Sequence, residues 1–251
     1  MSARSIAILS GKGGVGKTTT TINLGVALTQ LGKNVVVVDV NLVTPNVSLQ
    51  LGLPPTPANL NSVLKGKASI RDAICTHESG IRVIPAGLSI LESSEPLLVE
   101  YSDVLAPLSE FHDIILLDCG AGLWGNIAKA VRAADEVIVV TNPELPALID
   151  ALKSIQMVEK LRVPLRGVVL NRSNGSNYDA STEVIGGILN GYKILGNIPY
   201  DKSVLKSAAV RKPVVYYKPY SKAAQAYRKL AADIAGIEYR KSFLELIFGA
   251  F

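Results

Sequence analysis

The chain has little cysteine, few aromatic side chains and no long hydrophobic run. Its 251 residues include two cysteines, one tryptophan and four phenylalanines. Two thiols are too few for a disulfide framework or a four-thiolate metal site, which indicates a reducing compartment. No apolar run approaches the roughly 18 residues of a membrane-spanning helix, and the first residues carry no signal-peptide cleavage pattern. We therefore expect a soluble, cytoplasmic protein.

Aliphatic residues are plentiful instead, and hydrophobic residues make up 48% of the chain. They occur in short, nearly continuous Val, Ile and Leu runs, which favours parallel strands buried on both faces. Helical stretches alternate with these runs. The pattern predicts an α/β fold with a mostly parallel sheet of about seven to eight strands and helices on both faces. The predicted strands are 6–9, 35–38, 81–84, 114–117, 137–140, 168–170 and 194–198, and the predicted helices are 18–31, 96–109, 126–134, 146–161 and 221–234.

A glycine-rich loop joins the first predicted strand to the first predicted helix. Residues 10–19 read S-G-K-G-G-V-G-K-T-T, which contains G-x-x-x-x-G-K-T. Such glycines let backbone N–H groups turn around a phosphate, and the following helix adds its positive dipole end. Lys17 can reach the β- and γ-phosphates of ATP, and the Thr18 hydroxyl can ligate Mg²⁺. The predicted phosphate-binding residues here are Gly11, Lys12, Gly13, Gly14, Val15, Gly16, Lys17, Thr18 and Thr19.

Two aspartates follow buried strands. Asp118 ends the run 114–117, in the manner of a Walker B acid that holds Mg²⁺ directly or through water, and Asp39 ends the run 35–38. We predict that Thr18, Asp39 and Asp118 form the magnesium site. The backbone N–H of Gly122, four residues after Asp118, is predicted to contact the γ-phosphate.

The loop K-G-G-V-G-K-T, with its second lysine Lys12, resembles the deviant Walker A loop of MinD/ParA-type ATPases. Further stretches resemble the same family in order and spacing: V-D-V-N at 38–41, D-C-G-A-G at 118–122, T-N-P-E at 141–144, the strand-ending V-V-L-N-R at 168–172 and I-P-Y-D at 198–201. The resemblance covers nearly all of residues 4–236. It implies a three-layer P-loop NTPase fold, ATP and Mg²⁺ as ligands, and a homodimer that closes with ATP.

The resemblance also implies roles for single residues. Lys12 would reach the nucleotide of the partner subunit and act with Lys17 in catalysis. Asn41 stands where many relatives carry an acid that orients the attacking water. An amide orients water but cannot take a proton, so we expect slow hydrolysis with intact ATP binding. The residues implied to surround adenine are Asn171, Arg172, Pro199 and Asp201.

The basic excess lies at the C-terminal end. Residues 201–251 hold ten Lys or Arg and four Asp or Glu, whereas the first 200 hold sixteen and seventeen. The predicted ATPase domain, 1–237, is followed by a tail, 238–251, with one apolar helical stripe. The tail resembles the membrane-targeting helix of MinD proteins, which implies peripheral binding to an acidic inner membrane surface; docking on the protein itself is the alternative. The stripe consists of Phe243, Leu244, Ile247, Phe248 and Phe251.

The sequence leaves two functions open. One is a MinD-type regulator of intracellular positioning that is stimulated by an activator protein. The other is a ParA-type partition ATPase whose basic surface binds DNA without sequence preference. An iron–sulfur carrier would need paired cysteine ligands, which Cys75 and Cys119 do not supply by their spacing. The residues that would contact DNA are Lys202, Lys206, Arg211, Lys212, Lys218, Lys222, Arg228 and Lys229.

Overall fold

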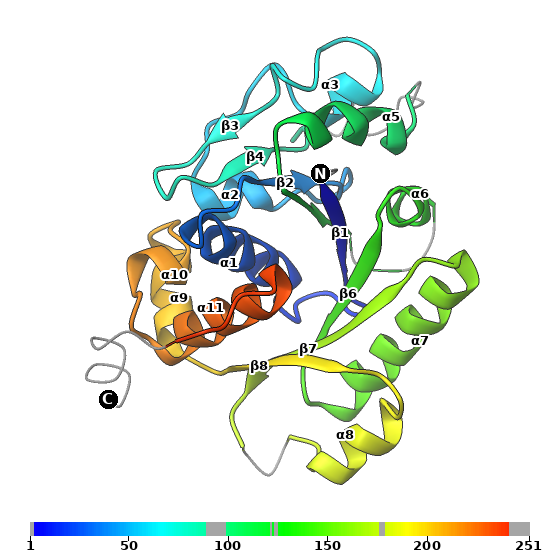
Figure 1. Cartoon of the computed structure of the whole chain (residues 1–251), viewed down its shortest axis with the longest axis vertical. Coiled ribbons are helices and arrows are strands. Elements are labelled where there is room, and N and C mark those ends of the chain that lie inside the picture. Colours follow the sequence, from blue (N-terminus) through cyan, green and yellow to red (C-terminus); the bar gives the residue numbers. More distant parts are fainter. Residues whose placement is uncertain (1–2, 89–98, 121, 123–124, 176–178, 241–251) are drawn as a thin grey trace.

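An eight-stranded sheet forms the centre of the protein in the computed structural model (Figure 1), which describes residues 3–88, 99–120, 122, 125–175 and 179–240. The strand order is β3-β4-β2-β5-β1-β6-β7-β8. Edge strand β3 is antiparallel to β4, and the other neighbours are parallel. The strands are β1 (Arg4–Leu9), β2 (Val35–Asp39), β3 (Cys75–Thr76), β4 (Arg82–Ile84), β5 (Ile114–Asp118), β6 (Glu136–Thr141), β7 (Leu165–Ser173) and β8 (Ile194–Pro199).

Helices cover both faces of this sheet. Three are long: α1 (Lys17–Gln30), α7 (Leu145–Leu161) and α11 (Lys222–Ala235). The shorter ones are α2 (Val47–Leu51), α3 (Leu60–Leu64), α5 (Tyr101–Leu105), the 3-10 helix η1 (Ala106–Glu110), α6 (Asn126–Arg132), α8 (Thr182–Ile188), α9 (Lys202–Ala209) and α10 (Val214–Tyr217). The predicted α/β class, with a mostly parallel sheet between two helical layers, is confirmed.

Successive side chains of the central strands enter different cores. Ala7 and Leu9 of β1 pack in a cluster with residues of α3, α5, α6 and α7, whereas Ile6 and Ile8 pack with residues of α1, α2, α10 and α11. Figure 1 shows these two sets of helices on opposite sides of the sheet. Burial on both faces explains why the strands are Val, Ile and Leu runs rather than alternating patterns.

The parallel strands bring their carboxyl ends to one edge. Asp39 at the end of β2 lies beside Asp118 at the end of β5, and Ile8 of β1 pairs with Asp118 on its other side. The glycine-rich loop leaves β1 at this same edge. In open α/β sheets ligands bind at this edge, and here the topology gathers segments that are far apart in the sequence.

Several elements differ from the sequence-based expectations. The single helix predicted over 96–109 is wrong in its described part, where α5 ends at Leu105 and η1 follows with Pro107 near its start. Proline lacks the N–H that would continue an α-helix. The sequence did not predict α8 and α9, which are short helices of seven and eight residues with mostly exposed side chains. No helix in the described part of the chain has the length and apolarity that crossing a bilayer requires.

Candidate nucleotide site

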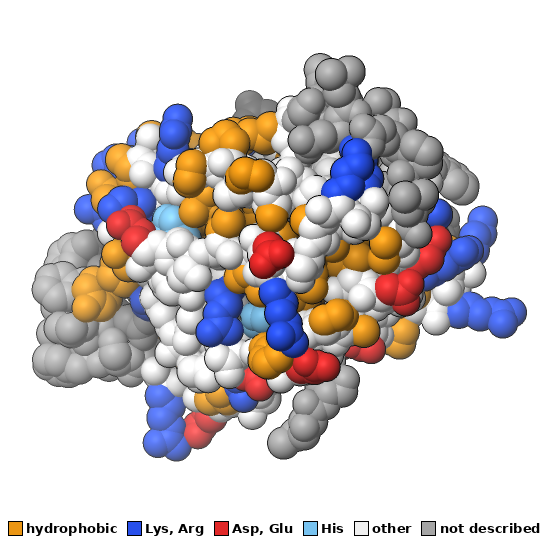
Figure 2. Space-filling model, turned by 90° about the horizontal axis from the view of Figure 1, so that it is seen from above, with side chains coloured by type: hydrophobic (Ala, Val, Ile, Leu, Met, Phe, Trp, Pro, Cys, Tyr) orange, Lys and Arg blue, Asp and Glu red, His pale blue; other side chains and the backbone are white. Residues whose placement is uncertain are grey.

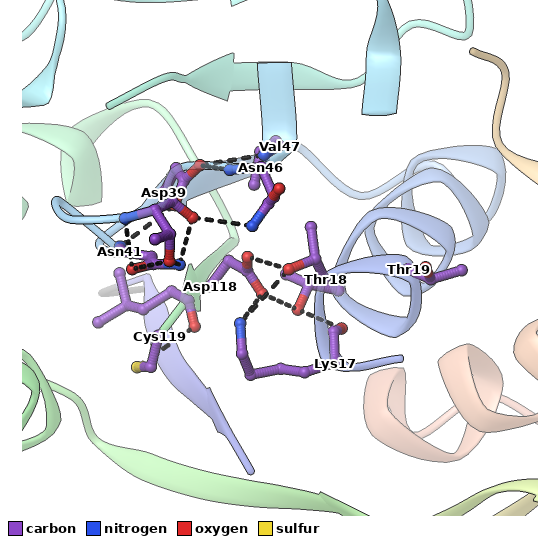
Figure 3. A network of polar contacts seen from close by, with 12 residues as sticks. Lys17, Thr18, Thr19, Asp39, Asn41, Asn46, Val47, Asp118 and Cys119 are labelled. Carbon is purple, nitrogen blue, oxygen red and sulfur yellow. Dashed lines mark hydrogen bonds and ion pairs between the residues drawn. The ribbon is translucent and has the colours of Figure 1, made fainter. Parts of the chain in front are cut away.

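The centre of the candidate site is a buried cluster of hydroxyl, ammonium and carboxylate groups (Figure 3). Lys17 Nζ lies 2.8 Å from Asp118 Oδ1, and Thr18 Oγ1 donates to Asp118 Oδ2 at 2.7 Å. Asp118 is fully buried, and Lys17 and Thr18 are 7% and 9% exposed. The predicted Walker A lysine and threonine therefore contact the predicted Walker B aspartate.

Close packing holds the backbone of the glycine-rich loop. A Cβ atom on Gly11 would collide with the backbone of Asp150 in α7, and one on Gly16 would collide with the amide of Asn171. Gly16 also has a φ of 90°, in the left-handed region that favours glycine. Both positions therefore require glycine, because neighbouring elements leave no room for a side chain.

Two asparagines bind the loop from the ends of β6 and β7. Asn171 Nδ2 donates to the carbonyl of Val15 at 2.7 Å. In the amide orientation that satisfies its neighbours, the Asn142 nitrogen donates to the carbonyls of Val15 and Asn171, both at 3.1 Å. Arg172 has a φ of 60° and sits at a register shift in β7. This bulge exposes the arginine and keeps Asn171 against the loop.

Asp39 lies beside Asp118 but holds the segment that follows β2. Its carboxylate accepts hydrogen bonds from the backbone N–H groups of Asn41, Asn46 and Val47 at 3.2, 3.0 and 3.0 Å (Figure 3). Burial, and to a smaller extent the negative charge of the nearby Asp118, raises the pKa of Asp39 to about 7. Two adjacent carboxylates without bulk solvent make this edge of the sheet favourable for a cation.

Asn41 is engaged within its own turn. Its Nδ2 donates to the carbonyl and, at 3.0 Å, to the hydroxyl of Thr44, and its Oδ1 accepts from the Thr44 N–H at 3.2 Å. A Cβ on Gly120 would lie 3.1 Å from Asn41 Oδ1. Asn41 therefore lies against the loop that follows Asp118, with its amide hydrogen-bonded to Thr44.

A pocket next to the glycine-rich loop contains the four residues predicted to surround adenine. Two hydrogen bonds fix one side of it: the Asp201 carboxylate accepts from the N–H groups of Ser203 at 2.7 Å and Ala223 at 3.1 Å. Tyr227, another lining residue, is buried. Partial burial opposes ionisation of Asp201, but these hydrogen bonds hold its pKa below the ordinary value. The carboxylate thus caps α9 and anchors α11. The lining residues are Gly16, Thr19, Asn171, Arg172, Pro199, Tyr200, Asp201, Val204, Leu205 and Tyr227.

The remaining predicted residues differ in exposure and contacts, and some lie outside the described residues. Lys12 is exposed at the tip of the loop, and Gly122 is half-buried with a φ of 103°. Thr19 hydrogen-bonds at 3.2 Å to Gln50 of α2. The stripe residues Phe243, Leu244, Ile247, Phe248 and Phe251 lie outside the described residues.

Sequence reasoning missed two residues that contact this site. Thr21 Oγ1 donates to Asp118 Oδ1 at 2.9 Å, and Asn142 binds the loop as described above. Thr21 follows Lys17 by four positions on a helix, and this spacing places both side chains on one face. The spacing was a signal that could have identified it.

The donor set fits magnesium. Thr18, Asp39 and Asp118 offer only oxygen atoms, which Mg²⁺ prefers, and Mg²⁺ is commonly held by one or two carboxylates together with substrate phosphates. The part of the chain that the structure describes has no group of three or more His, Cys, Asp and Glu side chains placed to bind a metal. Cys119 is fully buried, and burial raises the pKa of its thiol to about 12, so it does not offer a thiolate.

Comparison with known proteins agrees with this geometry. A ParA family model, described as NUBPL iron-transfer P-loop NTPase, matches residues 2–235. An uncharacterized ATP-binding protein of Methanocaldococcus jannaschii is 39% identical over 94% of this chain and 89% of its own length. The septum site-determining protein MinD of Pyrococcus horikoshii, solved with Mg-ADP, is similar with a TM-score of 0.86 at 36% identity, over 92% of this chain and 96% of that one.

A complex of MinC with MinD from Aquifex aeolicus, described as cell division proteins, is also similar. Its matching chain has a TM-score of 0.82 at 29% identity, over 96% of this chain and 99% of that one. The predicted resemblance is thus confirmed over nearly the whole described fold. The chain belongs to the ParA/MinD family of P-loop NTPases and is an ATP-binding ATPase of that family.

Proposed function

We propose that this ATPase is a MinD-type switch that binds ATP with Mg²⁺, closes as a dimer over two nucleotides and regulates intracellular positioning. The observation that carries the proposal is the buried contact of Lys17 and Thr18 with Asp118, in a loop that also carries the exposed Lys12. In this proposal the cluster is the phosphate and magnesium site, and the exposed Lys12 is the cation that faces a second subunit. The Mg-ADP complex of the Pyrococcus relative supports the choice of ligands.

Nucleotide binding would exchange partners inside the cluster. The Lys17 ammonium would leave Asp118 for the β- and γ-phosphates, and the Thr18 hydroxyl would turn to the metal. Bound Mg²⁺ would neutralise phosphate charge. Asp118 would hold the metal directly or through water, whereas Asp39, whose oxygens bind the N–H groups of 41, 46 and 47, would act through water and keep this segment in place.

Slow hydrolysis is part of the proposal. Asn41 is close to Gly120 and is positioned by Thr44, so it can orient a water molecule after a small rearrangement. It cannot accept that water's proton. Catalysis then depends on positioning and on positive charge from Lys17 and from Lys12 of a second copy.

Membrane association through residues 238–251 would depend on the dimer. A buried Leu or Phe contributes roughly 1.5–3 kcal/mol, and each basic residue near an acidic leaflet adds about 1 kcal/mol. Ordering roughly a dozen residues costs about 1–2 kcal/mol each, so one tail binds only marginally. Two tails on one dimer bind much more tightly, because the second binding event is intramolecular.

The exposure of basic side chains near the C-terminal end supports DNA as an alternative binding partner. Six of the eight basic residues considered above are exposed in the structure: Lys202, Lys206, Arg211, Lys218, Lys222 and Lys229. The other two are held by the protein itself, since Lys212 pairs with Glu78 at 2.8 Å and Arg228 donates to backbone carbonyls. On the face shown in Figure 2, basic side chains are interspersed with acidic, uncharged and hydrophobic ones. The exposed basic residues that would contact DNA lie in or between α9 and α11.

The test is size-exclusion chromatography with ATP, with ADP and without nucleotide, followed by sedimentation with acidic liposomes. We expect a dimer and liposome binding only with ATP, and a monomer with ATP for Lys12→Ala that still binds nucleotide. A wild-type protein that stays monomeric with ATP would refute the switch. DNA binding that falls steeply between low and moderate salt, without liposome binding, would support the second candidate.

A further inference from the structure

The carboxylate of Asp118 has more hydrogen-bond donors than the proposed function uses. Three side chains donate to it: Lys17 at 2.8 Å, Thr18 at 2.7 Å and Thr21 at 2.9 Å. Lys17 and Thr21 both bind Oδ1, whereas Thr18 binds Oδ2. Asp118 and Thr21 are both fully buried in the nucleotide-free protein, so bulk water does not replace a lost donor there.

Two of these three donors turn to the nucleotide in the proposed function. Lys17 goes to the phosphates and Thr18 to the metal. Thr21 lies one helical turn beyond Lys17, with its hydroxyl inside the protein. Once Lys17 has left, Thr21 is the side chain of this cluster that still binds Oδ1.

The hydroxyl of Thr21 has one proton and two acceptors. It lies 3.0 Å from the Lys17 carbonyl, its helical partner, and 2.9 Å from Asp118 Oδ1. While Lys17 binds Oδ1, the proton is shared at little cost. When Lys17 leaves, Thr21 is the remaining side-chain donor to Oδ1 among these three, and a buried carboxylate oxygen that loses its donors is strongly unfavourable, so the proton is needed on Asp118.

We infer that Thr21 is a positioning residue that holds the Asp118 carboxylate during the exchange of Lys17 from Asp118 to the phosphates. This inference rests on the proposed function. The helix offers a matched control, because the neighbouring Thr20 is equally buried but its hydroxyl lies 3.4 Å from that of Tyr227.

The first experiment measures Mg-ATP affinity by calorimetry for Thr21→Val, Thr21→Ser and Thr20→Val. We expect about tenfold weaker binding for Thr21→Val, and affinities within about twofold of wild type for Thr21→Ser, which keeps the hydroxyl, and for Thr20→Val. Wild-type affinity in Thr21→Val would overturn the inference. So would an equal loss in Thr20→Val, or a failure of serine to restore binding.

The second experiment needs no nucleotide and separates this inference from the proposed function. Urea unfolding is measured for Thr21→Val with Lys17 present and with Lys17→Ala. We expect Thr21→Val to destabilise the protein more when Lys17 is absent, raising the unfolding equilibrium constant by about tenfold more than it does when Lys17 is present. Equal effects in both backgrounds would overturn the inference. Absence of Mg-ATP binding by the wild-type protein, in contrast, would refute the proposed function. The comparison of Thr21→Val in the two backgrounds would still test whether Thr21 holds Asp118 when Lys17 is absent.

Discussion

The ammonium group of Lys17 lies 2.8 Å from Oδ1 of Asp118, and the two side chains are 8% and 0% exposed. The pair joins the first turn of α1 to the end of β5. Each charge compensates the other in a site from which bulk water is excluded. Stability of the nucleotide-free protein and readiness for a phosphate thus depend on the same contact.

Removal of the Lys17 ammonium should therefore destabilise the protein even without nucleotide. Breaking a buried ion pair by removing one partner costs about 3–5 kcal/mol, because the other charge stays buried. We expect a loss of this size in urea unfolding of Lys17→Ala. Lys12→Ala, which removes the same group from an exposed position of the same loop, should change stability by less than about 0.5 kcal/mol. Equal losses would contradict the role given to the pair.

Replacement of Asn41 by aspartate should accelerate ATP hydrolysis. The change keeps the shape of the side chain and supplies a group that accepts a proton, and general-base assistance contributes about 10²-fold or more. The measurement is steady-state phosphate release at saturating Mg-ATP. Asn46→Asp adds the same charge in the same segment and should not accelerate it. An unchanged rate in Asn41→Asp would show that Asn41 does not limit hydrolysis.

Stability of the nucleotide-free protein should fall with rising pH because of Asp39. Its pKa is about 7 in the folded protein, against an ordinary value of 3.8, so the folded chain keeps a proton that the unfolded chain releases between these values. The free energy of unfolding then decreases as pH rises from about 4 to about 7, by at most ~1.4 kcal/mol per pH unit. Asp39→Asn should remove this slope in urea unfolding at pH 5, 6, 7 and 8. The control Asp103→Asn, at an exposed position, should retain the pH dependence. If Asp39→Asn shows the same pH dependence as wild type, another group is responsible for it.

Replacement of Phe243 and Phe248 by alanine should abolish ATP-dependent sedimentation with acidic liposomes. Two lost aromatic anchors per subunit remove about 3–6 kcal/mol of burial from a marginal contact. ATP binding, measured by calorimetry, should be unchanged. Phe111→Ala, which removes a 52% exposed phenylalanine outside the tail, is the control. Liposome binding that persists in the double variant would exclude the tail as the membrane contact.

Prediction from the sequence succeeded where the chemistry is local. Residues 10–16 form a tight loop between a strand and a helix, and the spacing of their glycines is enough to predict this loop. The runs that became β2 and β5 end in acids, and parallel pairing then places Asp39 beside Asp118. The helix predicted over 96–109 was wrong because propensity did not outweigh Pro107. The asparagine after 168–170 was expected at a strand end, yet β7 continues to Ser173 through a bulge at Arg172.

The sequence by itself determined the class of fold, the phosphate loop and the acids at the strand ends, because backbone conformation and hydrophobic periodicity are properties of neighbouring residues. Only the tertiary structure decided which groups share a proton or a charge. Thr21 contacts Asp118 across 97 positions of the chain, and Asn171 contacts Val15 across 156. Such contacts depend on how the sheet orders its strands. A buried donor stabilises its acceptor because folding has removed the water that would otherwise take its place.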